Sequence, residues 1–233
     1  MEIRNLHPWD IPVDQALGIQ EELARDLILR NEFDEIETIA GAAVAVDLKE
    51  GVAHAGVIVY AYPSLVPIEA VVAKQKLHFP PAPGLLSFRE APVLLEAFQR
   101  LDVEPDLIFF DGQGVAHPRK LGIASHMGLL LDRPTIGVST TRLTGKSRTP
   151  GPKEGDVAEL ILESKLVGYV FRSKKGALPL YLSPGHRLDF ETALKFVRTC
   201  MDGFRLPRPI REATALAEAA KKGKPKDFLN KLK

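Results

Sequence analysis

The sequence predicts an α/β domain in which one mixed β-sheet is flanked by helices. Three β-rich runs come first, within residues 39–79, and helical and strand-like runs alternate after them. Strands followed by alternating helices and strands are typical of a mixed sheet with helices packed on its faces. Residues 1–220 are expected to form one domain, because neither an internal repeat nor a long linker interrupts them.

The first half is expected to hold one helix and a three-stranded antiparallel unit. Apolar side chains recur at helical spacing in residues 14–30. Residues 39–47, 53–62 and 66–79 are predicted to be strands, with "LKEG" as the hairpin turn between the first two. The run "PPAPG" then ends the third strand, since a segment so rich in proline cannot continue a ladder.

The second half alternates helices and strands. The run "SFREAPVLLEAFQRL" is predicted to be a helix, with Ser87 as its N-cap and Glu90 at the capping-box spacing. The run "PDLIFFDG" is a short apolar strand ending in Asp111, as buried central strands do. Further strands are expected in "PTIGV", "KLVGYVFRSK" and "LPLYLS", and helices at residues 189–203 and 209–221.

Composition and charge are ordinary and indicate no partner. The chain is 45% hydrophobic and 26% charged, with a net charge of +1. Its single cysteine, Cys200, excludes an internal disulfide and a cysteine-based zinc site, and its helical context predicts a buried thiol. Without a signal pattern or an apolar run long enough for a membrane span, we expect a cytoplasmic protein and a monomer. The lysine-rich tail, residues 221–233, is expected to be a solvated, frayed end, with a weak attraction for phosphate as the alternative.

Two acids stand where a metal-dependent hydrolase would need them. Glu90 falls in the first turn of a predicted helix, and Asp111 at the carboxyl end of a predicted buried strand. Hydrolysis of a phosphodiester with Mg²⁺ needs carboxylates that converge from different elements. Taken alone, helix capping by Glu90 and turn formation by Asp111 explain these residues equally well.

A glycine-rich and then basic run, "GQGVAHPRK", follows Asp111. Gly112 lets the backbone pass close to a ligand, and His117, Arg119 and Lys120 suit phosphate contacts. The plain alternative for His117 is a loop histidine hydrogen-bonded to backbone. His126, in "ASHMG", is expected to be a packed helix histidine rather than a ligand.

Two blocks, "PGLLSFREAP" and "DGQGVAHPRKLGIASHMGLLLDRPTIGV", resemble the endonuclease V family, whose members nick nucleic acid near deaminated adenine. Shorter runs, "LHPWDIP", "RSK", "SPGH" and "LPRP", are also similar to that family. The resemblance implies a ribonuclease H-like fold, Mg²⁺ or Mn²⁺ as cofactor, and DNA or RNA, including inosine-containing strands, as partner. It implies that Glu90 and Asp111 bind the metal and that His117 lies beside the scissile phosphate. It also implies that Gly84, Leu86 and neighbouring backbone form the pocket for a flipped-out base.

Four positions depart from the family's pattern. The family has an aspartate, its central metal ligand, where this chain has Ala43, and a lysine where it has Thr140. It has a histidine or aspartate at the position of Thr214, and a wedge tyrosine at the position of Pro81. We therefore expect a magnesium site that is weak or absent. An engineered substitution could explain Ala43 alone, so four departures favour natural divergence.

Three hypotheses follow, in this order. The first is a divergent family member that binds nucleic acid and has weak or no nuclease activity. The second is an active Mg²⁺-dependent endonuclease that cleaves 3′ to inosine, with Asp47 or Glu218 in place of a lost ligand. Asp47 stands roughly 13 Å beyond Ala43 unless the strand register shifts. The third is a protein-interaction module, which the retained basic loop argues against.

Overall fold

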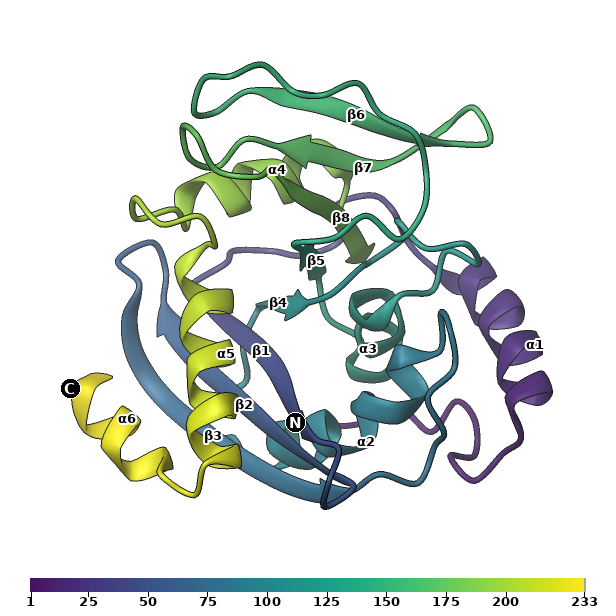
Figure 1. The fold of residues 1–233 in the computed structure, drawn as a ribbon, viewed down its shortest axis with the longest axis vertical. Coiled ribbons are helices and arrows are strands. Elements are labelled where there is room, and N and C mark those ends of the chain that lie inside the picture. Colours follow the sequence, from purple (N-terminus) through teal and green to yellow (C-terminus); the bar gives the residue numbers. More distant parts are fainter. Residues whose placement is uncertain (233) are drawn as a thin grey trace.

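The computed structural model describes residues 1–232 and contains one eight-stranded mixed sheet with helices on both faces (Figure 1). The strand order is β3-β2-β1-β4-β5-β8-β7-β6. The strands are β1 (Thr38–Asp47), β2 (Val52–Ala61), β3 (Val66–Lys76), β4 (Leu107–Asp111), β5 (Thr135–Ser139), β6 (Val157–Leu162), β7 (Lys165–Phe171) and β8 (Leu180–His186). The helices are α1 (Val13–Leu23), α2 (Leu86–Gln99), α3 (Ile123–Leu131), α4 (Phe190–Thr199), α5 (Arg208–Lys221) and α6 (Pro225–Leu232).

The pairing of the strands agrees with the predicted order of elements. Strands β1, β2 and β3 form an antiparallel unit, and β4 pairs parallel with β1 and with β5. Strand β8 runs antiparallel to β5, and β7 and β6 continue the sheet to its second edge. The predicted mixed sheet flanked by helices, of the ribonuclease H-like class, is therefore confirmed.

Two hydrophobic clusters cover the two faces of the sheet. In β1, Ile39 packs with side chains of α4 and α5, whereas Ala40 and Ala42 pack with side chains of α2 and α3. In Figure 1, α5 lies across β1 and β2. The apolar residues of β4 are buried between the two layers, so Asp111 is the first exposed position at the carboxyl end of that strand.

Several sequence-based boundaries were wrong, and tertiary contacts explain the main ones. The first helix ends at Leu23 and a short 3₁₀ turn follows, because Leu23 and Leu27 pack on α3 instead of continuing one stripe. Ser87 is not an N-cap: α2 begins at Leu86, and the Ser87 hydroxyl pairs with Nδ1 of His126, 3.0 Å away. The third strand ends at Lys76, and β6 was not predicted.

The C-terminal tail is helical rather than frayed over most of its length. Helix α6 packs Phe228 and Leu229 against the cluster between the sheet and α4 and α5, and this apolar contact holds the segment in place despite its lysines. Lys233 lies outside the described residues. Cys200 is a buried free thiol, as predicted. Within residues 1–232, no helix is both long and apolar enough to span a membrane.

Candidate metal and nucleic-acid site

The sheet brings the acids and two of the substituted positions to one place. Strands β1 and β4 pair with Ala42 opposite Phe110, so Ala43 and Asp111 follow at the next position of adjacent parallel strands. From α5, the Thr214 hydroxyl lies 3.4 Å from Oδ2 of Asp111. Glu90 approaches from α2, close enough for the charge of Asp111 to act on it. We call Ala43, Glu90, Asp111 and Thr214 the acid cluster.

The carboxylates of Glu90 and Asp111 have protein around them on most sides, although the Asp111 residue keeps solvent-exposed surface. Burial, together with the charge of Asp111, raises the pKa of Glu90 to about 8, and the nearby Arg89 opposes this shift only in part. Burial also raises the pKa of Asp111, against the effect of the Thr214 hydroxyl. Because the pKa of Glu90 is raised, a cation that binds there must displace the proton of this carboxyl group, so metal binding would depend on pH.

The donor set does not fit a resident divalent cation. Across residues 1–232, no three or more His, Cys, Asp or Glu side chains are grouped so that they could hold a metal ion. The Ala43 methyl group offers no ligand, and the Thr214 hydroxyl is also engaged with the carbonyl oxygen of Ile210 at 2.8 Å. Two acids and a neutral hydroxyl fall short of the oxygen-rich shell that Mg²⁺ takes.

Neither candidate replacement ligand joins the acid cluster. The β1–β2 register runs without a shift from Ala43 opposite Gly56 to Asp47 opposite Val52. Oδ1 of Asp47 accepts hydrogen bonds from the backbone N–H groups of Lys49 (2.9 Å) and Glu50 (3.1 Å). These two hydrogen bonds lower the pKa of Asp47 and tie its side chain to the hairpin turn. Glu218 lies one helical turn beyond Thr214 and belongs to no potential metal-binding group among the described residues.

A second cluster holds the loop that precedes α2. The carbonyl oxygen of Gly84 accepts hydrogen bonds from Nε2 of Gln20 (2.9 Å), Nε2 of His117 (2.9 Å) and Nη2 of Arg119 (3.3 Å). Nε of Arg119 also donates to Oε1 of Gln20 at 2.6 Å, and Gln20 donates to the Leu121 carbonyl at 3.0 Å. We call Gln20, His117, Arg119 and the Gly84 carbonyl the Gly84 clamp. The clamp ties helix α1 and the basic loop to the segment before α2.

The clamp uses both ring nitrogens of His117. Nδ1 accepts the backbone N–H of Arg119 at 3.2 Å, so Nε2 carries the proton that is donated to Gly84. Burial, with the charge of Arg119, lowers the pKa of His117 to about 4, and the imidazole is neutral at physiological pH. These contacts agree with the alternative expectation for His117, a loop histidine that is hydrogen-bonded to backbone. Here His117 and Arg119 position the loop, and the partly exposed Lys120 is the basic side chain of this run without a hydrogen-bond partner among residues 1–232.

Three of the predicted nucleic-acid contacts lie in one hollow next to the clamp. The hollow has a volume of about 440 Å³ and is lined by Pro81, Ala82, Pro83, Gly84, Leu85, Leu86 and Arg89. Gly84 has φ +73°, which side chains rarely adopt, and a Cβ there would lie 2.7 Å from Nη2 of Arg119, so a substitution would strain the turn and displace the arginine. Gly112 is buried at the end of β4, and Thr140 is exposed just after β5.

Sequence reasoning missed Gln20. It lies on α1, among the apolar positions that predicted the helix, and its side chain is fully buried. A buried glutamine carries no local signal, because the three groups that it contacts lie 64 to 101 residues away along the chain. His126 is a packed histidine, as predicted, and pairs with Nε2 of His7 at 2.7 Å.

A ribonuclease H-like sheet with paired carboxylates beside a clamped, glycine-containing loop defines a protein of the nucleic-acid nuclease class. The family model described as Endonuclease V matches residues 21–215. The chain belongs to the endonuclease V family. It is 42% identical over 213 residues to an endonuclease V of Dehalococcoides mccartyi, which covers 91% of this chain and 96% of that one.

Solved structures agree with this assignment. The crystal structure of an endonuclease V from Bacillus subtilis superposes with a TM-score of 0.90 at 28% identity, over 96% of this chain and 98% of that chain. An endonuclease V of Ciona intestinalis, crystallised as a D234N variant with a 23mer DNA that contains an inosine, has a TM-score of 0.80. It is 24% identical over 91% of this chain and 99% of that chain. At this identity, the likeness supports the fold alone.

Proposed function

We propose that this protein binds nucleic acid, with inosine-containing strands preferred, and that it cleaves them weakly or not at all. The observation that carries the proposal is that Ala43 and Thr214 are the neighbours of Asp111 in the acid cluster. Neither the Ala43 side chain nor the Thr214 side chain can supply a charged ligand. A weak Mg²⁺ site completed by phosphate oxygens is the most that Glu90 and Asp111 would provide.

The binding half of the proposal rests on the Gly84 clamp and the hollow beside it. The clamp fixes the loop that presents Pro81 and Leu86, and Leu86 is 42% exposed in the hollow. An extruded base needs such a fixed, partly apolar recess with backbone groups at its wall. Pro81 would fill part of the gap in the strand, and Lys120 would contact a phosphate. The related Ciona intestinalis protein was crystallised with inosine-containing DNA, which supports the choice of ligand.

The test compares the unmodified chain with its Ala43→Asp, Thr140→Lys, Thr214→His variant. Binding of labelled single- and double-stranded oligonucleotides with one inosine is measured by fluorescence anisotropy, and cleavage by gel, with Mg²⁺ and then Mn²⁺. DNA and RNA versions are run in parallel. We expect both proteins to prefer the inosine strand over its unmodified control, and only the triple variant to nick it.

Two results would overturn the proposal. Efficient nicking by the unmodified chain, abolished by Asp111→Ala, would show that the acid cluster is catalytic without its missing ligands. Equal binding of inosine and control strands by both proteins would show that the hollow does not read the base.

A further inference from the structure

Strand β5 leaves the sheet next to the acid cluster and continues into a long loop. Asp111 pairs with Val138 in the parallel β4–β5 ladder, so this loop starts at the same end of the sheet as the acids. Residues 140–156, which we call the β5–β6 loop, lead to β6 at the second edge of the sheet (Figure 1). Because three successive antiparallel pairings separate β5 from β6, the loop also ends at that end of the sheet.

Positive charge is concentrated in the β5–β6 loop. Residues 140–153 contain Arg142, Lys146, Arg148 and Lys153 and no acid, whereas the whole chain has a net charge of only +1. The remainder of the chain is therefore net negative. A positive segment in a chain that is otherwise net negative is typical of a surface that binds phosphates.

Three of these cations are exposed and unpaired. The side chains of Arg142, Lys146 and Arg148 make no hydrogen bond or ion pair within residues 1–232. Most other arginines of the chain are engaged, as Arg187 and Arg208 are with carboxylates. An arginine whose donors are all free can bind two oxygens of a phosphate group at once.

Hydrogen bonds hold the first part of the β5–β6 loop in place. Nε2 of Gln113 donates to Oγ of Ser139 (3.0 Å) and to the carbonyl oxygen of Thr141 (3.3 Å). Further along, the backbone of Lys146 exchanges two hydrogen bonds, of 2.7 and 2.8 Å, with the backbone of Ile161 in β6. The start of the loop is therefore attached to the segment that follows β4.

The last part of the loop is held as well. Nε and Nη2 of Arg172 donate to the carbonyl oxygens of Gly151 (3.2 Å) and Pro150 (3.4 Å). The backbone N–H of Lys153 donates to Oδ2 of Asp156 at 2.7 Å. A loop that is already ordered loses less conformational entropy when it binds a ligand.

A trough of about 660 Å³ separates part of the loop from β6. Lys146 and Arg148 line it on the loop side with the hydroxyl-bearing Ser147 and Thr149, and Glu159 lines it on the β6 side. Lysine, arginine and hydroxyl side chains are the usual contacts of phosphate and sugar groups. The carboxylate of Glu159 repels phosphate, so an anionic strand would follow the loop side of the trough.

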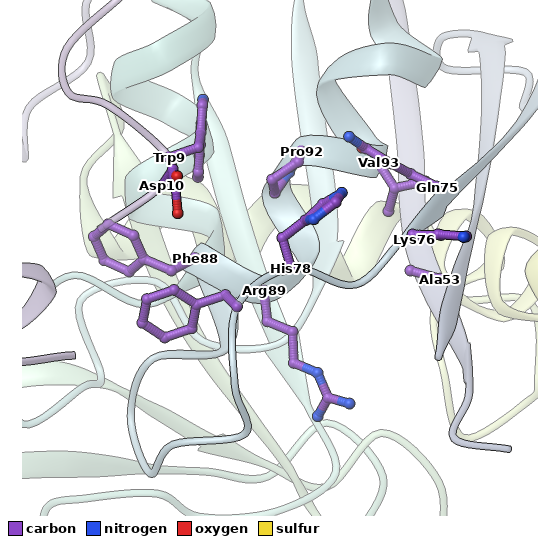
Figure 2. A pocket seen from close by; sticks show the side chains of 11 residues that line it. Trp9, Asp10, Ala53, Gln75, Lys76, His78, Phe88, Arg89, Pro92 and Val93 are labelled. Carbon is purple, nitrogen blue, oxygen red and sulfur yellow. The ribbon is translucent and has the colours of Figure 1, made fainter. Parts of the chain in front are cut away.

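The cations nearer to the hollow are arranged differently. Lys76, His78 and Arg89 line a pocket beside Trp9, together with the carboxylate of Asp10 (Figure 2). Figure 2 shows the side chains of Lys76 and Arg89 pointing in different directions. These three side chains do not form a row along which a strand could lie, unlike the cations of the β5–β6 loop.

We propose that the β5–β6 loop binds the sugar-phosphate backbone of the strand on one side of the nucleotide that the hollow holds. Arg142 contacts a phosphate near the acid cluster, and Lys146 and Arg148 contact phosphates further along. Backbone contacts carry no sequence information, so the loop adds the same affinity for inosine-containing and unmodified strands. The inference rests on the proposed function and extends it to a second contact region.

The length of the loop limits how much of the strand it can reach. The chain from Ser139 to Arg148 spans at most roughly 30 Å. One strand of a duplex rises ~3.4 Å per nucleotide, so this span corresponds to about nine nucleotides. The loop should therefore contact only one of the two arms that flank the inosine.

A triple variant removes the three free cations, and a matched control removes the same charge elsewhere. The loop variant carries Arg142→Gln, Lys146→Gln and Arg148→Gln. The control carries the same kind of change at three exposed positions on other elements, Arg25→Gln, Lys49→Gln and Lys74→Gln. Binding of labelled single- and double-stranded oligonucleotides, with inosine or its unmodified counterpart, is measured by fluorescence anisotropy over a series of salt concentrations.

We expect the loop variant to bind every strand more than about tenfold more weakly at 0.1 M salt, with its preference for inosine unchanged. The slope of log K against log salt should become shallower by about 1.5 to 2, because each lost phosphate contact removes about 0.7 to 0.9. The control should keep the slope of the unmodified chain. Glu159→Gln should act in the opposite direction and strengthen binding about twofold, because it removes a repelling charge.

Arm length then shows on which side of the inosine the loop lies. Extending one arm from about three to about ten nucleotides should strengthen binding by the unmodified chain and by the control, and leave the loop variant unaffected. Extending the other arm should affect all three proteins equally. Poly-glutamate, added as a competitor, should displace the strand only weakly, because its carboxylates do not match the spacing of backbone phosphates.

The inference and the proposed function fail in different ways. If the loop variant keeps the affinity and salt slope of the control while inosine is still preferred, the inference is overturned and the proposed function stands. Tighter binding of poly-glutamate than of any strand would also overturn the inference, because the loop would then fit an acidic protein. If the loop variant loses slope but no protein prefers inosine, the backbone contact stands and the base-reading role of the hollow fails. Absence of any strand binding by the unmodified chain would overturn both.

Discussion

The Gly84 clamp and the acid cluster lie at the same end of the sheet but differ in how fully their groups are paired. In the clamp, one carbonyl oxygen receives three donors, and Gln20 and Arg119 also bond to each other. In the acid cluster, two carboxylates with raised pKa values face a methyl group and a hydroxyl. The difference teaches that the position of the loop before α2 and the charge of the acid cluster depend on separate side chains.

Breaking the clamp at its centre should have the largest effect. Gln20→Leu leaves Gly84, Leu121 and Arg119 with fewer partners in a buried place, and we expect a loss of about 3 kcal/mol in the free energy of unfolding. Chemical denaturation measures it, and binding of the inosine oligonucleotide should weaken with it. Gln15→Leu, at an exposed position of the same helix, serves as the control. A stability equal to that of the control would show that the clamp is not a stabilising unit.

Adding a third carboxylate to the acid cluster should lower the stability of the fold unless a divalent cation binds. Ala43 is 2% exposed, so Ala43→Asp places a third carboxylate in a buried site and should destabilise the fold by about 2 kcal/mol without a divalent cation. In the Ala43→Asp, Thr214→His protein, Mn²⁺ should restore the lost free energy of unfolding and so raise the melting temperature.

The control for cation rescue is Ala45→Asp, a buried alanine two residues further along β1. It should be destabilised to a similar extent and show no recovery with Mn²⁺. Recovery of this control to the same degree would show that the cation acts on the whole protein rather than on the acid cluster.

Lowering the pH should destabilise the clamp, because His117 must take up a proton. The unfolded chain takes up the proton of His117 near pH 6.5 and the folded chain near pH 4, so stability falls as the pH drops from 6.5 toward 4. At about pH 5 this amounts to about 2 kcal/mol. Denaturation curves of His117→Gln should show a pH dependence that is smaller by this amount, whereas His78→Gln, at an exposed position, should match the unmodified chain. Identical pH profiles for His117→Gln and the unmodified chain would refute the buried, neutral histidine.

The smallest effect is expected at Asp47. Asp47→Asn weakens two hydrogen bonds in an exposed hairpin turn, so the melting temperature should fall slightly and inosine binding should stay the same. Any residual cleavage should also be unchanged. Loss of a Mg²⁺-dependent activity in this variant would mean that Asp47 reaches the acid cluster after all.

The sequence allowed the sheet and the acids to be predicted because their signals are local. An apolar run ending in Asp111, and three β-rich runs before a proline-rich break, need no knowledge of distant contacts. The clamp needs such knowledge, since Gln20 meets Gly84 and Leu121 only after folding. Ser87 shows the same limit: its capping-box spacing was valid locally, but His126 of α3 binds the hydroxyl.

The close approach of α5 to β1 has a consequence for the history of this site. A Cβ at Gly41 would lie 2.0 Å from the carbonyl oxygen of Pro209, so the start of α5 rests on bare strand backbone two residues before Ala43. Because backbone rather than ligand side chains sets this spacing, residues 43 and 214 could change without disturbing how the helix is seated. A change of side chain at either position would therefore leave the packing of α5 on β1 intact. Because the position of α5 is fixed in this way, substitutions at residues 43 and 214 alone would place new ligand side chains beside Asp111.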